Sequence, residues 1–234
     1  MKMSTKEKIE QYTDWFSQRI KFIKGIGDDD TTILVCCTLI DALGKCAQPE
    51  RGSKERFINL LELFGNNDIW TRVSICHLVS EGNKYIKGYQ DLTTYTCEKL
   101  KWVDQNDCSN PYTVDPKIDT IQNEIRALDF ANKFMKFCQK YKYSTYFYER
   151  YRCGLVHEAK ILRDSTAWDY TRENRPHYIR YTPKLPLNSQ PIETKKHLIF
   201  PSTFIADETI KINNQLKEWL TKQNINPYER YGLE

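Results

Sequence analysis

Apolar residues recur at helical spacing over residues 115–141, and this pattern constrains the fold more than any other feature of the sequence. Asp115 and Pro116 stand at its start, and they are favoured residues at the N-cap and the first position of a helix. Spacings of three, four or seven positions place side chains on one face of an α-helix. The sequence therefore predicts one long helix over residues 115–141. Its apolar face holds Ile118, Ile121, Ile125, Leu128 and Met135.

Caps and apolar spacing predict several further helices. Ser4 and Glu7 have the pattern of a capping box, in which each side chain binds the other residue's backbone amide. A second helix, over residues 145–161, follows the long one after a short break, so the two are expected to pack antiparallel. The other helices are expected over residues 5–24, 31–46, 53–64, 69–79 and 202–222.

The part of the chain after residue 167 has a different character. Polar and apolar residues alternate in His177–Tyr181, and Lys196–Phe200 also has an extended pattern, so the two segments are expected to form a small hairpin. No internal repeat or long linker divides the chain. We therefore predict a mainly α fold, a single helical-bundle domain over residues 1–234 with a small β-hairpin near its C-terminus. The motif helices occupy about residues 115–161, and the hairpin and last helix about residues 167–222.

Composition excludes several classes of protein. Hydrophobic residues make up 40% of the chain, but no stretch approaches the ~20 apolar residues of a membrane-spanning helix. None of the eight cysteines has the two-residue spacing of a zinc ligand pair. We therefore expect a cytoplasmic protein that has reduced thiols, binds no metal or cofactor, and does not bind membranes. The net charge of +4 does not identify a partner.

An arginine followed after four to six residues by a histidine occurs four times. The four pairs are Arg152 with His157, Arg150 with the same His157, Arg72 with His77, and Arg172 with His177. His77 lies in an apolar segment that predicts a core histidine, and His177 follows Pro176 at the start of an expected strand. A five-residue offset sets two side chains about 140° apart on an ideal helix. Arg152 and His157 can therefore face one site if the helix is distorted or a second subunit closes the site.

Basic and aromatic residues surround Arg152 and His157 in the sequence. Basic groups bind nucleic-acid phosphates, and aromatic faces stack on unpaired bases. The same pattern is also typical of a solvated lysine face with tyrosines half in the core. The candidate RNA-binding residues are Arg150, Lys133, Lys136, Lys140, Tyr148 and Tyr151.

The segment from Tyr148 to Ala159 contains Arg-Cys-Gly-Leu-Val-His and resembles the motif helix of bacterial HEPN proteins. Ile40–Leu43, the segment from Gly52 to Ile58, and the Asp115-Pro116 pair also resemble that superfamily, and the similarity spans about residues 30–220. The resemblance implies a metal-independent endoribonuclease of a toxin or phage-defence type, active as a homodimer. It also implies Arg152 and His157 as catalytic residues, with a possible antitoxin or regulatory protein as partner. Cys153 stands where the superfamily usually has a polar residue.

The expected chemistry is attack of a ribose 2′-OH on the neighbouring phosphate. Histidine is suited to moving the protons near neutral pH, and an arginine can stabilise the charged phosphate. The alternative is a non-catalytic helical module of the same type that binds RNA, a nucleotide or a partner protein. A helical scaffold without a site remains a third reading.

Overall fold

A computed structural model describes residues 3–79, 115–126, 131–158, 174–181 and 195–231. Its first helix begins at the predicted capping box. In α1, Thr5–Lys24, the Glu7 amide donates to Ser4 Oγ at 3.3 Å and the Ser4 amide donates to Glu7 Oε2 at 2.7 Å. Asp28 Oδ2 accepts from the Thr31 amide at 2.8 Å and so caps α2, Asp29–Ala47. These helices and α3, Ser53–Phe64, match the predicted ranges within two residues.

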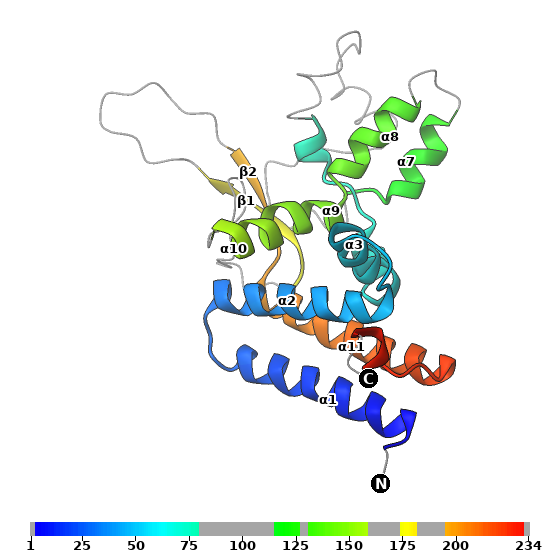
Figure 1. Ribbon diagram of the computed structural model, residues 1–234. Helices are drawn as coiled ribbons and strands as arrows, with labels where there is room; N and C mark the ends of the chain where they lie inside the picture. The colour runs from blue at the N-terminus through cyan, green and yellow to red at the C-terminus, as the bar shows by residue number, and fades with distance from the viewer. Residues whose placement is uncertain (1–2, 80–114, 127–130, 159–173, 182–194, 232–234) are drawn as a thin grey trace.

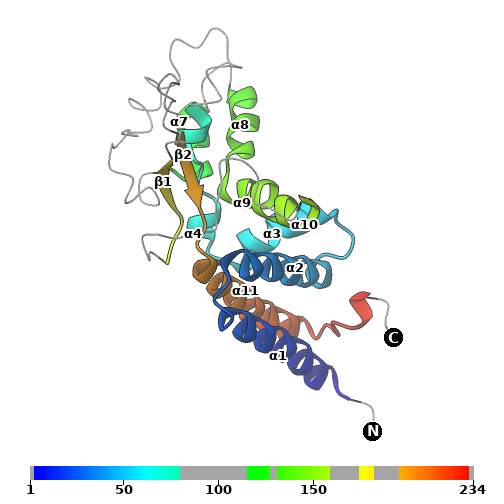
Figure 2. The same ribbon diagram turned by 90° about the vertical axis from the view of Figure 1, so that its left-hand side faces the viewer.

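Three long helices form one side of the molecule. The last of them, α11, Ser202–Gln223, packs against both α1 and α2, and the three lie side by side (Figure 1). In a second view, α1 and α11 again lie side by side (Figure 2). Helix α3 covers another face of α2, so α2 is enclosed by helices. The predicted mainly helical fold with a small hairpin is confirmed.

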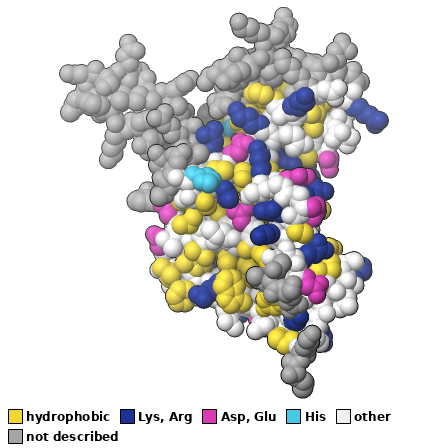
Figure 3. Space-filling model, viewed as in Figure 1, with side chains coloured by type: hydrophobic (Ala, Val, Ile, Leu, Met, Phe, Trp, Pro, Cys, Tyr) yellow, Lys and Arg dark blue, Asp and Glu magenta, His cyan; other side chains and the backbone are white. Residues whose placement is uncertain are grey.

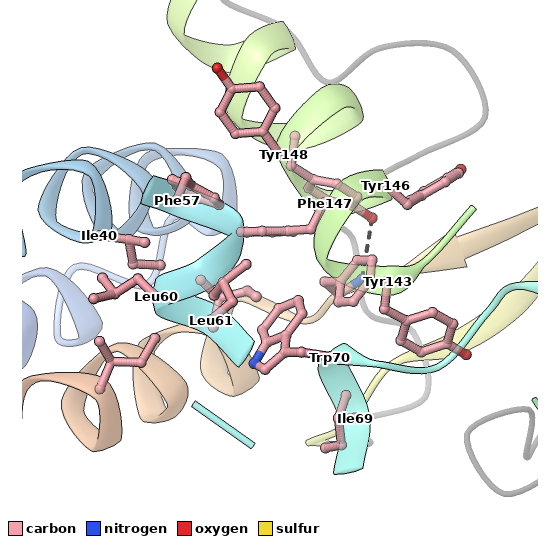
Figure 4. Packing of buried hydrophobic residues seen from close by; sticks show 14 of the residues in the cluster. Ile40, Phe57, Leu60, Leu61, Ile69, Trp70, Tyr143, Tyr146, Phe147 and Tyr148 are labelled. Carbon is pink, nitrogen blue, oxygen red and sulfur yellow. Dashed lines mark hydrogen bonds between the residues drawn. The ribbon is translucent and has the colours of Figure 1, made fainter. Parts of the chain in front are cut away.

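An aromatic cluster joins these helices to the rest of the chain (Figure 4). At its centre lies Trp70, the last residue of α4, Asn67–Trp70, which is fully buried. Its ring stacks on Phe200 at a centroid distance of 5.5 Å, and Phe147 lies 5.5 Å away. The indole N–H donates to Glu208 Oε2 at 2.8 Å, which binds α4 to α11.

The predicted helix over residues 69–79 is wrong in its first half. Helix α4 ends at Trp70, and Arg72 and Val73 then form antiparallel bridges with Lys117 and Lys142. The Val73 amide donates to the Pro116 carbonyl at 2.9 Å. These pairings use backbone N–H and C=O groups that would otherwise bond within a helix. Helical structure resumes only at residue 75.

The single long helix predicted over residues 115–141 is also wrong. The chain forms two helices, α7, Ile118–Ile125, and α8, Ala131–Lys140, which pack against each other. Lys117 occupies the N-cap position of α7, and its side chain makes no cap hydrogen bond there. Asp115 is not the cap, because its carboxylate is buried and accepts the hydroxyl protons of tyrosines elsewhere in the fold.

The segment after α8 forms one continuous helix with a change of winding in its middle. It comprises α9, Tyr143–Phe147, a π-helical turn, Tyr148–Arg152, and α10, Cys153–Glu158. This helix runs across the end of α8 rather than along it (Figures 1 and 2), so the expected antiparallel packing is not observed. It packs on α2 and α3 instead.

The predicted hairpin is confirmed. Strands β1, His177–Tyr181, and β2, Lys195–Ile199, pair antiparallel, with His177 opposite Ile199 and Tyr181 opposite Lys195. Leu198 and Ile199 are fully buried, so the hairpin is part of the core. Over the described ranges, none of the helices has the length and apolar character needed to cross a membrane.

Candidate functional site

Arg152 is the last residue of the π-helical turn, and His157 lies five positions later in α10. The Cys153 amide donates to the carbonyl of Tyr148, five residues earlier, instead of four as in an α-helix. Arg152 Nη1 lies 3.1 Å from His157 Nε2, within hydrogen-bonding distance. Turns of this kind often occur at functional sites.

Asp41 of α2 holds the arginine from the other side. Its Oδ2 accepts from Arg152 Nε at 2.9 Å and from Arg152 Nη2 at 2.8 Å. Ser53 Oγ, at the start of α3, donates to Asp41 Oδ1 at 3.4 Å. Burial lowers the pKa of Arg152, but hydrogen bonding and attraction to Asp41 outweigh it, and the net pKa is raised. The guanidinium therefore keeps its charge and a fixed orientation.

The direction of the bond between Arg152 and His157 follows from the chemistry of the two groups. A guanidinium has only N–H donors, so His157 Nε2 must accept, and the imidazole proton is then on Nδ1. His157 is exposed, whereas the Arg152 side chain is only 14% exposed. The pair thus consists of a fixed cation and an exposed imidazole whose Nε2 lone pair accepts from that cation.

Two candidate tyrosines lie beneath this pair in the core. The Arg152 guanidinium lies 5.3 Å from the centre of the Tyr148 ring, which packs against Phe57. Tyr151 is fully buried, and its hydroxyl donates to the Leu198 carbonyl at 3.0 Å. Tyr148 thus supports the guanidinium and Tyr151 anchors β2, so neither ring is placed to stack on a base.

The other predicted basic residues do not gather at this pair. Arg150 lies over the Tyr146 ring, with 5.9 Å between the guanidinium carbon and the ring centre. Lys136 and Lys140 are exposed on α8, beyond the opposite end of the helix that carries Arg152 (Figure 1). Lys133 is on α8 too, but its side chain is outside the described residues.

Sequence reasoning missed the residues of α2 and α3 that complete the site. Asp41 directly follows the buried apolar segment 33–40. A charged residue beside such a segment could have indicated a functional position. Ser53 binds Asp41, and Lys54 Nζ lies 2.6 Å from Glu149 Oε1. Basic and acidic side chains alternate over this face of the molecule (Figure 3).

The rival arginine–histidine pairs have structural roles instead. Arg72 donates to the carbonyls of Asp68 and Asp115, while His77 Nδ1 lies 2.7 Å from Ser74 Oγ. His177 is buried, and Arg172 lies outside the described residues. The structure therefore favours Arg152 and His157 among the four sequence matches.

A second group of polar residues is buried around Asp115. Asp115 Oδ2 accepts from the hydroxyls of Tyr143 and Tyr178, both at 2.7 Å, and Ser74 Oγ bonds the Tyr178 hydroxyl. Burial raises the pKa of Asp115 to about 7, although these hydrogen bonds and the charge of Arg72 lower it. This group links β1 to α9 and to the segment before residue 79.

We expect Asp115 to make the protein less stable as the pH rises from about 4 to 7. The folded state retains a proton that an unfolded aspartate, with a pKa near 4, has already lost. The free energy of unfolding should therefore fall by at most about 1.4 kcal/mol per pH unit over this range. Urea unfolding of the parent and of Asp115→Asn at pH 5 and pH 7 measures the effect. The parent should lose stability relative to the variant, and parallel pH profiles would contradict the expectation.

Comparison with models of known protein families, with curated proteins and with solved structures found no match. Within the part of the chain that the structure describes, no cluster of His, Cys, Asp and Glu side chains could hold a metal ion.

Proposed function

We propose that the protein is a metal-independent endoribonuclease of the HEPN type, acting in the cytoplasm in a toxin or phage-defence role. The supporting observation is the distance of 3.1 Å between Arg152 Nη1 and His157 Nε2 at the surface of the π-helical turn. This arrangement sets a proton acceptor beside a charge that can stabilise a phosphate. Both are requirements of RNA cleavage by the ribose hydroxyl.

In the proposed reaction, the phosphate takes the place of His157 at Arg152 Nη1, and the released His157 Nε2 accepts the proton of a ribose 2′-OH. The 2′ oxygen then attacks the adjacent phosphorus, and the bond from phosphorus to the 5′ oxygen breaks. The leaving oxygen takes a proton from a general acid, so the products are a 2′,3′-cyclic phosphate and a 5′-hydroxyl. Arg152 stabilises the negative charge on the phosphate oxygens, and Asp41 keeps its guanidinium in place.

The general acid is the reason to propose a homodimer. One histidine cannot be base and acid in the same step, whereas two related by a two-fold axis can. Val156, beside His157 on α10, is 38% exposed, which is consistent with a surface that meets a second copy. An antitoxin or other regulatory protein is a further proposed partner that would have to cover the same surface.

A specific observation favours the non-catalytic alternative. Asp41 occupies the Nε and Nη2 edge of the guanidinium, and His157 occupies a donor on Nη1. Further N–H groups on Nη1 and Nη2 remain for a phosphate, which can bind them while His157 Nε2 still accepts from Arg152. An Nε2 held in this way does not take a proton, so this bond suits a module that binds RNA or a nucleotide without cleaving it.

The test is incubation of the purified protein with end-labelled RNA in excess EDTA. Cleavage should persist and yield 2′,3′-cyclic phosphate ends. Arg152→Lys should be slowed roughly 10²-fold or more, because lysine keeps the charge but cannot bond Asp41 and a phosphate through one planar group. The preparation should scatter light as a dimer.

Arg150→Ala is the matched control, since Arg150 lies two positions away on the same turn but faces Tyr146. It should cleave within a few-fold of the parent, and its thermal unfolding should match that of Arg152→Lys within a few degrees. Loss of cleavage in EDTA, or equal effects of the two substitutions, would overturn the proposed site. A monomer that cleaves at full rate would remove the dimer from the mechanism.

A further inference from the structure

A cavity of about 410 Å³ lies between α1, α2 and the C-terminal segment, away from the Arg152 site. Aromatic rings form most of its wall, and no charged side chain lines it. Its volume is within the range of small-molecule pockets, roughly 300–1,000 Å³. The lining residues are Gln11, Tyr12, Trp15, Phe16, Ala42, Tyr228 and Tyr231.

The hydroxyl groups of the wall are already used within the protein. Tyr231 donates to the Ala42 carbonyl, so its oxygen accepts the proton of Tyr12 across 2.9 Å. The Tyr228 hydroxyl donates to Gln11 Oε1 at 3.3 Å. A ligand rich in hydroxyls would find few donors here. The wall of the pocket is therefore suited to contact with an apolar surface of a ligand.

The rings are arranged as several walls rather than as one stack. Tyr12 meets Tyr228 nearly edge-on, at 83° and 6.1 Å, and meets Phe16 at 54° and 4.8 Å. Trp15 forms one wall and remains 49% exposed, which is unusual for so large an apolar side chain. An added flat ring could contact one wall face-on and another edge-on, and both geometries are favourable for aromatic pairs.

We infer that this pocket binds an uncharged, flat aromatic ring system of the size of an indole or a purine base. The inference is independent of the proposed ribonuclease activity, because the pocket is lined by residues of α1, α2 and the C-terminal segment and by none of the Arg152 site. The volume suits one such ring system. The uncharged lining gives no reason for the ring to carry a charge.

Ligand-observed NMR and calorimetry with indole, adenosine and cyclohexanol, each at millimolar concentration, provide the test. At least one aromatic compound should bind the full-length protein, and cyclohexanol should not. Binding of adenosine but not indole would assign a nucleobase, and the reverse would assign an indole-like ring. Trp15→Ala should weaken binding by roughly fivefold to a hundredfold, as expected for loss of a stacking partner.

Phe22→Ala is the matched control, because Phe22 is on the same helix, is 68% exposed and does not line the pocket. Both substitutions remove exposed rings, so neither should unfold the chain, and unchanged thermal melting would confirm this. The inference fails if neither aromatic compound binds, or if cyclohexanol binds as well as they do. It also fails if Phe22→Ala weakens binding as much as Trp15→Ala, or if Trp15→Ala leaves binding unchanged.

Discussion

Replacing His157 with alanine is expected to lower RNA cleavage roughly 10²–10⁴-fold without unfolding the chain. The imidazole is exposed, so its loss creates no cavity, and Arg152 remains held by Asp41. The loss should therefore appear in the rate of cleavage and not in the melting temperature. Initial rates on labelled RNA in EDTA, with circular dichroism melts of the same samples, measure both.

The pH dependence separates proton transfer from a simple binding role. Cleavage by the parent should depend on pH in a bell shape, since a base and an acid are both needed. Arg150→Ala should keep that shape, because it leaves the histidine in place. If His157→Ala cleaves as fast as the parent, the activity belongs elsewhere. If no form cleaves RNA but the parent binds it, the non-catalytic module is the better explanation.

Replacing Trp70 with alanine should destabilise the fold by about 3–5 kcal/mol, the largest structural effect that we expect from one substitution. The ring is fully buried and contacts Phe147, Phe200 and Phe204. Its removal leaves a large cavity and takes one hydrogen bond from the buried Glu208. Urea unfolding followed by circular dichroism gives the free energy.

Trp70→Phe divides this effect into its parts, because phenylalanine fills most of the space but cannot donate to Glu208. It should fall between the parent and Trp70→Ala. The exposed Phe22 gives a surface control, and Phe22→Ala should change the stability by less than about 0.5 kcal/mol. If Trp70→Ala were as stable as that control, the aromatic cluster around Trp70 would not stabilise the packing of the helices that it joins.

Local signals predicted the elements whose ends are determined by nearby residues. Helix α1 begins at Ser4 and α2 at Asp28 because those side chains cap the following amides. The β1–β2 hairpin was predicted from the alternation in His177–Tyr181 and the extended pattern of Lys196–Phe200. These elements depend on interactions between residues only a few positions apart, so they can be predicted from the sequence alone.

The errors fall where distant residues compete with local preference. Asp115 is a good N-cap in sequence, but Tyr143 and Tyr178 bind its carboxylate, and these partners lie 28 and 63 residues away. The helix expected over residues 69–79 is interrupted because Val73 pairs with Lys142. No local pattern contains this information, so these features required the structure.

The same distinction applies to the candidate site. The spacing alone gave four matches, and only the surrounding motif favoured Arg152 and His157 in the sequence. The choice depends on Asp41, which is 111 residues from Arg152 in the chain. The expected stacking by Tyr151 also failed as a local inference, because the ring packs against β2 instead of facing solvent.

The π-helical turn at Tyr148–Arg152 makes the site sensitive to the length of the chain as well as to its composition. Loss of one residue from this turn would restore ordinary winding. Everything after it would then rotate by about 100° and shift by about 1.5 Å along the axis. Arg152 and His157 would turn together away from Asp41 of α2, although all three side chains were kept. Related sequences can therefore share both residues and still lack the site, if insertions or deletions have changed the number of residues across this turn.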